Sequence, residues 1–202
     1  MKILYLGWPR SGSTWLYENI KQNSNLRDVG GIKESHLLYN DPVQGLLEFH
    51  DASIDFSTNN WSMDSSIANK LDATHYIMVH RHPLEILYSY HAKLGNQWDK
   101  WQSSCLSNKL LNVGDIIERW LNLKKKILLY EFTDLSANPE DFAKMVLTDL
   151  GLPTDNISVA PVNASVSKTQ NQLCPQLEEL LAQQEEKFQA LKGLADYRRL
   201  RH

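Results

Sequence analysis

The octapeptide at residues 7 to 14 reads Gly7-Trp8-Pro9-Arg10-Ser11-Gly12-Ser13-Thr14. It follows an apolar run at residues 3 to 6 and precedes a stretch of helical character at residues 15 to 20. Its two glycines have the spacing of a nucleoside triphosphate P-loop. The Lys that should follow the second glycine is replaced by Ser13, and the cation of this segment is Arg10. We therefore interpret it as a phosphate-binding loop that has lost the triphosphate lysine, and call it the phosphate loop.

A strand that turns through glycine into a helix directs backbone N–H groups and the positive end of the helix dipole at one point. This arrangement favours a bound anion. Gly12 permits close approach of the main chain, and the hydroxyls of Ser11, Ser13 and Thr14 can donate to phosphate oxygens. The alternative is an ordinary strand-to-helix turn capped by Ser or Thr.

The chain has 202 residues, of which 42% are hydrophobic, enough for one sizeable core. We expect one domain over residues 1 to 202. The formal net charge of -3 gives no electrostatic argument for nucleic acid as a partner, so an anion site must be built locally. The two cysteines, Cys105 and Cys174, are far apart in sequence and indicate neither a disulfide framework nor a zinc site.

No apolar run approaches the length of a membrane-spanning helix. The first apolar run begins directly after Met1-Lys2, which leaves no room for a secretory signal. These features predict a soluble, cytoplasmic protein without a membrane partner.

Apolar runs alternate with helical patterns along the chain. Strands are predicted at residues 3 to 6, 76 to 79 and 127 to 130, with further candidates at 29 to 32 and 52 to 56. Helices are predicted at residues 15 to 22, 63 to 71, 84 to 94, 113 to 123, 139 to 150 and 176 to 191. This alternation predicts an α/β fold of three layers, with a central parallel sheet flanked by helices, as in P-loop proteins.

Ligands of such sheets bind at the carboxyl ends of the strands. This rule selects the phosphate loop, Lys33-Glu34-Ser35-His36, His80-Arg81-His82-Pro83 and the segment from Glu131 onward. Arg81 follows a strand directly, and Ser89 comes eight residues later in the next predicted helix. A guanidinium and a hydroxyl so placed can hold a second phosphate. The alternative is that Arg81 makes a structural ion pair and Ser89 is an ordinary helix residue.

Here the residues resemble a known family. The segment from Pro9 to Trp15 looks like the 5′-phosphosulfate loop of sulfotransferases that use 3′-phosphoadenosine 5′-phosphosulfate (PAPS), and Arg81-His82-Pro83 with Ser89 resembles their 3′-phosphate motif. The resemblance runs from the first strand to about residue 180, and the pattern is most similar to bacterial, heparan 3-O-type and protein-tyrosine sulfotransferases. Two separated phosphate sites suit a nucleotide with both 5′ and 3′ phosphates. The strand before Arg81 supplies no Asp for Mg²⁺, which suits a transfer that needs no metal.

The resemblance implies roles for individual residues. Arg10 is expected to contact the 5′ phosphate and the bridging oxygen, while Ser11 to Thr14 hold the phosphosulfate. Trp15 matches a position whose ring stacks on adenine, although a Trp on this helix also suits plain core packing. Lys168 resembles a late family residue that closes over the nucleotide, and a solvated surface Lys is the alternative.

The acceptor must lose a proton as its oxygen attacks sulfur, so a general base is expected near the sulfuryl group. Glu34 lies 24 residues after Arg10, and Lys-Glu-x-His resembles the heparan 3-O-type and bacterial pattern. We therefore prefer Glu34 over His36, which would position the acceptor, orient Glu34 or act as the base itself. Apolar surroundings would raise the pKa of Glu34, and Lys33 would oppose this.

The sequence thus predicts a PAPS-dependent sulfotransferase that acts on a hydroxyl, or less readily an amine, of a carbohydrate, small molecule or peptide. A small P-loop nucleotide kinase and a non-catalytic nucleotide-binding module of the same fold are the alternatives. The acceptor and the oligomeric state cannot be read from the sequence.

Overall fold

The fold is built on a sheet of five parallel strands. The computed structural model describes residues 1–7, 10–51, 53–58, 60–94, 98–108, 111–159 and 172–200. The strands are β1 (Ile3–Tyr5), β2 (Ile54–Asp55), β3 (His75–His80), β4 (Ile127–Glu131) and β5 (Asp196–Arg198). Their order in the sheet is β2-β1-β3-β4-β5, and every neighbouring pair is parallel. The predicted α/β class is therefore confirmed.

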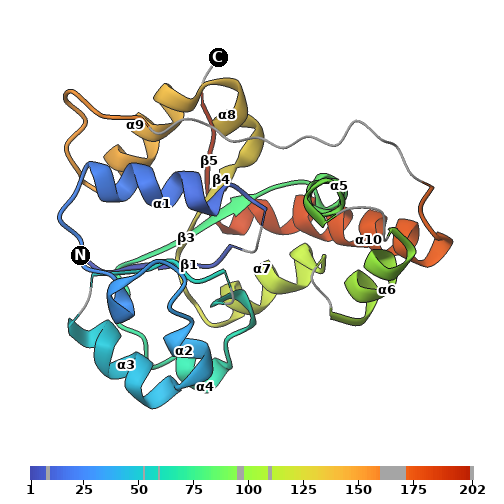
Figure 1. The fold of residues 1–202 in the computed structure, drawn as a ribbon, viewed down its shortest axis with the longest axis horizontal. Helices are drawn as coiled ribbons and strands as arrows, with labels where there is room; N and C mark the ends of the chain where they lie inside the picture. Colours follow the sequence, from blue (N-terminus) through green and yellow to red (C-terminus); the bar gives the residue numbers. More distant parts are fainter. Residues whose placement is uncertain are drawn as a thin grey trace.

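Helices cover both faces of this sheet (Figure 1). The α-helices are α1 (Ser13–Gln22), α2 (Leu37–Asn40), α3 (Pro42–Asp51), α4 (Ser65–Ala68), α5 (Pro83–Leu94), α6 (Trp98–Asn108), α7 (Val113–Asn122), α8 (Phe132–Ala137), α9 (Pro139–Asp149) and α10 (Pro175–Leu191). Short 3₁₀ helices are η1 (Val29–Gly31), η2 (Asn60–Ser62) and η3 (Lys192–Leu194).

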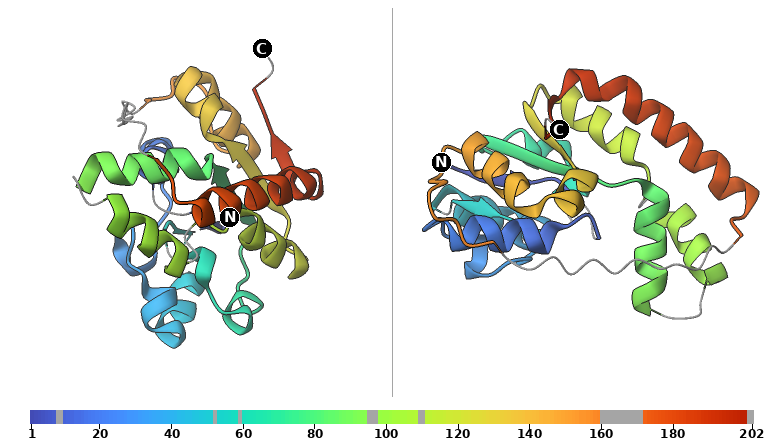
Figure 2. Two further views of the ribbon diagram at one scale, coloured as in Figure 1. Left: turned by 90° about the vertical axis from the view of Figure 1, so that its right-hand side faces the viewer. Right: turned by 90° about the horizontal axis from the view of Figure 1, so that it is seen from above.

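Alternation along the buried strands produces two cores. On one face, Ile77 and Val79 of β3 pack with α1, α8 and α9. On the other face, Tyr76 and Met78 pack with a core to which α3, α4, α5, α7 and α10 contribute. The two faces of the sheet are thus covered by different sets of helices, as the turned views also show (Figure 2). Both faces need cover because all five residues of β4 are buried.

The chain order creates a switch point between β1 and β3. From β1 the chain passes to β2 on one side, and then crosses to β3 on the other side of β1. In sheets of this kind, a crevice forms at the carboxyl ends of the two strands that flank the switch. The phosphate loop follows β1 and Arg81 follows β3, so the topology brings both predicted phosphate motifs to this crevice.

The structure corrects several predicted elements. Residues 29 to 32 were expected to form a strand, but they contain η1, because Gly30 and Gly31 adopt positive φ values of 62° and 74° that no strand permits. The predicted helix at 63 to 71 shortens to α4, and the strand at 52 to 56 to β2. Helix α6 lies in a region without a predicted element, and α2, α3, α8 and β5 were not predicted.

Among the described residues, the helices are all too short or too polar to cross a bilayer.

Candidate functional site

The phosphate loop turns into α1 through glycine. Gly12 is the N-cap of α1, with φ 82° and ψ 11°, and its carbonyl accepts from the backbone N–H of Leu16 at 3.0 Å. A Cβ on Gly12 would lie 3.0 Å from a Leu135 methyl and 3.2 Å from the Phe132 ring, both on α8. Only glycine combines this left-handed backbone with such close packing, so the turn that exposes the α1 N-terminus depends on it.

The hydroxyl side chains of the phosphate loop differ in their burial. The hydroxyls of Ser11 and Tyr5 are hydrogen-bonded at 2.7 Å, and both side chains are fully buried. Ser13 is also buried, whereas Thr14, one residue further, is exposed on the first turn of α1. Burial raises the pKa of Tyr5, against the opposing hydrogen bond from Ser11, so this pair stays neutral and fixes the loop. Thr14 is consequently the hydroxyl of this segment that faces solvent.

The two predicted phosphate motifs meet through Arg10. Its Nε donates to the Ser89 hydroxyl at 2.9 Å, and its carbonyl accepts from Arg81 Nη1 at 2.7 Å. Ser89 and Arg81 are buried, at 1% and 8% exposure. Arg81 also donates through Nε to Glu85 at 3.2 Å and lies over the Phe132 ring, 4.2 Å from its centroid. The ion pair foreseen as the alternative for Arg81 is therefore present, together with the direct link to the phosphate loop.

Glu34 and His36 lie on the β2 side of the crevice, in a network that reaches the phosphate loop. Lys33 Nζ donates to Glu34 Oε1 at 2.8 Å and to Thr14 Oγ1 at 3.1 Å. The other carboxylate oxygen of Glu34 accepts from the Thr58 hydroxyl at 2.8 Å and lies 3.6 Å from His36 Nε2. Thus Glu34, His36 and the first turn of α1 form one connected group.

Opposing effects act on the Glu34 carboxyl. Burial raises its pKa. Hydrogen bonds from Lys33 and Thr58, together with the charges of Lys33 and His36, lower the pKa by more than burial raises it, so the net pKa lies below its usual value. The sequence did not decide whether the pKa of Glu34 is raised or lowered, and in the structure the contact with Lys33 contributes to lowering it. In the free protein, Glu34 is therefore ionised and able to accept a proton, but it is a weak base.

A second layer of polar groups supports His36. His36 Nδ1 and the buried Ser57 hydroxyl are hydrogen-bonded at 2.6 Å. Behind them, Asp55 Oδ1 accepts from the Ser57 backbone N–H at 2.9 Å and from Asn60 Nδ2 at 3.3 Å. Burial raises the pKa of Asp55, only partly offset by these hydrogen bonds. The hydrogen bond between Ser57 and Nδ1 thus fixes the orientation of the His36 ring.

Backbone strain concentrates at these residues. Among the described residues, five other than glycine have positive φ, and three of them are Arg10 (68°), Glu34 (60°) and His36 (54°). A left-handed backbone costs a side-chain-bearing residue about 1–2 kcal/mol. Such strain persists where the surrounding structure over-determines it, commonly at functional sites. The three residues selected from the sequence as catalytic candidates thus share a left-handed backbone, and their catalytic roles stay predictions.

The two remaining predicted site residues are Trp15 and Lys168. Trp15 is buried, 6% exposed, and tilted against Phe142 of α9 with ring centroids 5.8 Å apart. Core packing accounts for this contact, and stacking on adenine stays a prediction. Lys168 lies outside the described residues.

Several site residues were not selected from the sequence as such. Lys33 belonged to a selected segment but was given no role beyond its effect on the pKa of Glu34, and Ser57 and Thr58 were not selected. A usable signal existed for the last two, because both directly follow the predicted strand at residues 52 to 56. The same strand-end rule that selected Arg81 would have included them.

A polar cavity of about 370 Å³ lies beside Arg81, at the carboxyl ends of β3, β4 and β5. In its lining, Glu131 is hydrogen-bonded to His80 Nδ1 at 3.1 Å and accepts from the Tyr197 hydroxyl at 2.7 Å. Burial raises the pKa of Glu131, but these hydrogen bonds and the His80 charge lower it below its usual value. The three side chains tie together β3, β4 and β5. The segment of β5 near the C-terminus is therefore a sheet edge held in place by side chains as well as by strand pairing.

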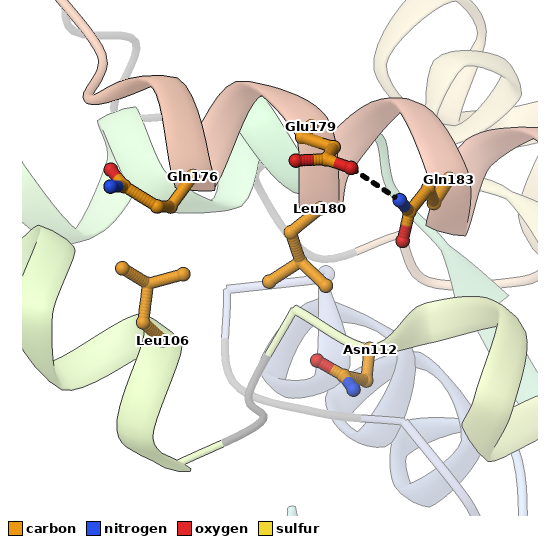
Figure 3. Close-up of a pocket in the computed structure, with 6 residues that line it drawn as sticks. All are labelled: Leu106, Asn112, Gln176, Glu179, Leu180 and Gln183. Atoms are coloured by element: carbon orange, nitrogen blue, oxygen red, sulfur yellow. Dashed lines mark hydrogen bonds between the residues drawn. The ribbon is translucent and has the colours of Figure 1, made fainter.

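A second cavity, of about 400 Å³, lies between α6, the start of α7 and α10 (Figure 3). Its lining combines two leucines with three amides and a carboxylate: Leu106, Leu180, Asn112, Gln176, Gln183 and Glu179. Gln183 donates to Glu179 at 3.0 Å, along the α10 face that borders the cavity (Figure 3). None of these residues is a cation or belongs to the phosphate loop, so the described lining offers no phosphate site.

Metal ligands do not cluster in the described ranges. No group of three or more His, Cys, Asp or Glu side chains there is arranged to hold a metal ion. The cations that lie beside the α1 N-terminus or contact the phosphate loop are Arg10, Lys33 and Arg81.

Comparisons with known proteins bear on the fold. No protein-family model matches the chain, and no curated protein matches its sequence. Among solved structures, the chain is similar to a sulfotransferase from Alicyclobacillus acidocaldarius, with a TM-score of 0.64 and 14% sequence identity. The similarity covers 98% of this chain and 96% of that one. The two proteins therefore share a fold over almost their whole length.

Proposed function

We propose that this protein is a sulfotransferase that moves a sulfuryl group from PAPS to a hydroxyl acceptor. The observation that carries the proposal is the contact between the two phosphate motifs: Arg10 of the phosphate loop donates to Ser89, and Arg81 donates to the Arg10 carbonyl. A nucleotide with phosphates at both its 5′ and 3′ positions needs two such sites side by side. A triphosphate instead needs its phosphates gathered on one loop with a lysine.

In this proposal the donor's 5′ phosphosulfate binds at the N-terminus of α1, where backbone N–H groups and the helix dipole favour an anion. Arg10 supplies the positive charge that the loop lacks at Ser13, and Arg81 with Ser89 binds the 3′ phosphate. Both arginines can hold phosphate oxygens through charge-assisted hydrogen bonds. The fold shared with a solved sulfotransferase supports this assignment.

The transfer is an in-line displacement at sulfur. A bond forms between the acceptor oxygen and sulfur, while the bond from sulfur to the 5′-phosphate oxygen breaks. The electron pair of the broken bond stays on that oxygen, where Arg10 stabilises the negative charge. The acceptor proton passes to Glu34, leaving adenosine 3′,5′-bisphosphate as the nucleotide product.

Hydrogen bonding at His36 supports Glu34 as the base. His36 Nε2 lies 3.6 Å from Glu34 Oε2, and the Ser57 hydroxyl and His36 Nδ1 are hydrogen-bonded at 2.6 Å. One ring nitrogen of His36 is thus held by Ser57 and the other faces Glu34, so we assign His36 to positioning the base rather than to taking the acceptor proton.

The experiment is a transfer assay with ³⁵S-labelled PAPS across carbohydrate, phenol, amine and peptide acceptors. We expect labelled product with the wild type and a loss of about 10²- to 10⁴-fold with Glu34→Gln, the usual contribution of a general base. The affinity of Glu34→Gln for adenosine 3′,5′-bisphosphate should stay at the wild-type value. Retained turnover in Glu34→Gln would contradict the base assignment. Bisphosphate binding without transfer to any acceptor would indicate a non-catalytic nucleotide-binding module instead.

A further inference from the structure

The side chain of Lys33 connects the base to the donor site. Its Nζ lies 2.8 Å from Glu34 Oε1 and 3.1 Å from the hydroxyl of Thr14. The Lys33 side chain is 17% exposed, so its ammonium group is largely shielded from solvent. One cation therefore contacts both the carboxylate that takes the proton and the helix turn that takes the donor.

This position is electrostatically unusual. The N-terminus of a helix is the positive end of its dipole, and a cation there is unfavourable unless an anion accompanies it. In the free protein the accompanying anion is the Glu34 carboxylate. A phosphosulfate at the α1 N-terminus would bring a second anion within reach of the same ammonium.

We propose that Lys33 is a donor-responsive switch: it pairs with Glu34 in the free protein and moves to the 5′ phosphosulfate when PAPS binds. This inference rests on the proposed function. Thr58 still donates to Glu34 Oε2 at 2.8 Å, and His36 still faces that oxygen, so Glu34 keeps its position when Lys33 leaves. The consequence is a base that becomes stronger only after the donor is in place, and an ordered reaction in which PAPS binds before the acceptor.

The contacts of Glu34 indicate what the switch changes. Burial raises its pKa, and the hydrogen bond and charge of Lys33 are prominent among the effects that outweigh burial. The groups that face the carboxyl are Lys33, His36 and Thr58. Removal of the Lys33 contact leaves burial opposed only by the other two, so the pKa of Glu34 rises. A stronger base then accepts the acceptor proton more readily.

The test is an NMR titration of ¹³C-labelled glutamate carboxyls, with the Glu34 signal assigned by its absence in Glu34→Gln. The Glu34 midpoint is measured in free protein and in protein saturated with PAPS without acceptor, for the wild type and for Lys33→Met. The negative donor alone raises the midpoint in both proteins. The switch adds the departure of Lys33, so we expect a larger rise in the wild type than in Lys33→Met, and a higher midpoint for free Lys33→Met than for free wild type.

Two further variants serve as controls. Lys33→Arg keeps a cation at this position and should restore most of the wild-type rise. Lys144→Met removes a similar lysine-carboxylate contact, with Glu140 at 2.7 Å on the exposed face of α9, and should leave the Glu34 titration unchanged.

Equal rises in wild type and Lys33→Met would overturn the switch alone, while turnover of the wild type would still support the proposed function. Absence of PAPS binding to the wild type would overturn both. Should Lys33→Met not fold, a crystal structure of the wild type with PAPS decides the matter: Lys33 Nζ on the phosphosulfate supports the switch, and Nζ still on Glu34 Oε1 overturns it.

Discussion

The substitution Arg81→Ala tests the link between the two phosphate motifs. It removes a charge-assisted hydrogen bond of 2.7 Å to the Arg10 carbonyl, worth about 1.5–3 kcal/mol. It also removes the guanidinium from the Phe132 ring, 4.2 Å away, worth about 0.5–2 kcal/mol. The ion pair with half-exposed Glu85 adds about 0.3–0.5 kcal/mol. We expect the variant to be destabilised by about 2–5 kcal/mol and its melting temperature to fall by about 5–15 °C.

The loss of binding has a separate signature. Adenosine 3′,5′-bisphosphate and adenosine 5′-monophosphate differ only in the 3′ phosphate, the group assigned to Arg81. Calorimetric titration of both ligands, below the melting temperature of the variant, should give a bisphosphate affinity reduced by about 10- to 100-fold, the equivalent of one charge-assisted hydrogen bond. The monophosphate affinity should be unchanged, so the difference in affinity between the two ligands narrows in Arg81→Ala.

A matched control separates structure from binding. Glu85→Gln removes the ion pair with Arg81 but leaves the guanidinium and its bond to the Arg10 carbonyl in place. This variant should bind the bisphosphate at least as tightly as the wild type, because Arg81 loses a competing carboxylate. An equal loss of monophosphate and bisphosphate affinity in Arg81→Ala would refute the reasoning, because Arg81 would then only hold the loop.

The other predictions concern the loop and the base. Gly12→Ala places a Cβ 3.0 Å from Leu135 on a backbone with φ 82°, so it should lower the free energy of unfolding in urea by about 2–3 kcal/mol. Gly151→Ala, where φ is 66° and no atom lies within 4 Å of the Cβ position, should lower it by about 1 kcal/mol. The pKa of Glu34 is below its usual value, so the acid limb of kcat/KM for PAPS, which reports the enzyme before the donor binds, should lie below about pH 4.3, the ordinary glutamate value. Because the pKa of Glu34 is lower in the folded state, its contribution to the free energy of unfolding is complete above its pKa in the unfolded chain. That contribution is lost as the pH falls through its pKa in the folded state, which acid unfolding can measure. Ser57→Ala should lower kcat without weakening bisphosphate binding, since Ser57 acts through His36; a full kcat would contradict that role.

The sequence predicts the central strands and the region of edge strand β2, but it misses edge strand β5, for a physical reason. Strands β1, β3 and β4 are buried on both faces and therefore appear as continuous apolar runs. Edge strand β2 has only two residues, and β5 is a half-buried Asp-Tyr-Arg whose pairing with β4 leaves no hydrophobic pattern. Such edge strands form because the neighbouring strand has backbone N–H and C=O groups available for pairing, and the local sequence of the edge strand does not indicate this.

Part of the site could be predicted because loops at strand ends carry it. Arg10 and Arg81 follow this rule and are in direct contact although they lie 71 residues apart, whereas Glu34 was selected after a strand expected at residues 29 to 32, where the structure has η1. The role of Lys33 could not be predicted, because its contact with Thr14 joins two loops whose relative placement depends on the whole sheet. The left-handed backbone of Arg10 and Glu34 was equally hidden, since residues of these types seldom adopt it, whereas His36 belongs to a type that is enriched there.

The most direct test of the account compares thermal stabilisation of the wild type by adenosine 3′,5′-bisphosphate, ADP and ATP, each with and without a metal chelator. A ligand at 100 times its dissociation constant stabilises by about 2.7 kcal/mol, a shift that is readily measured. The account predicts that the bisphosphate stabilises most, and equally with chelator. Stabilisation by ATP that exceeds the bisphosphate and disappears with chelator would contradict it and favour a nucleotide kinase.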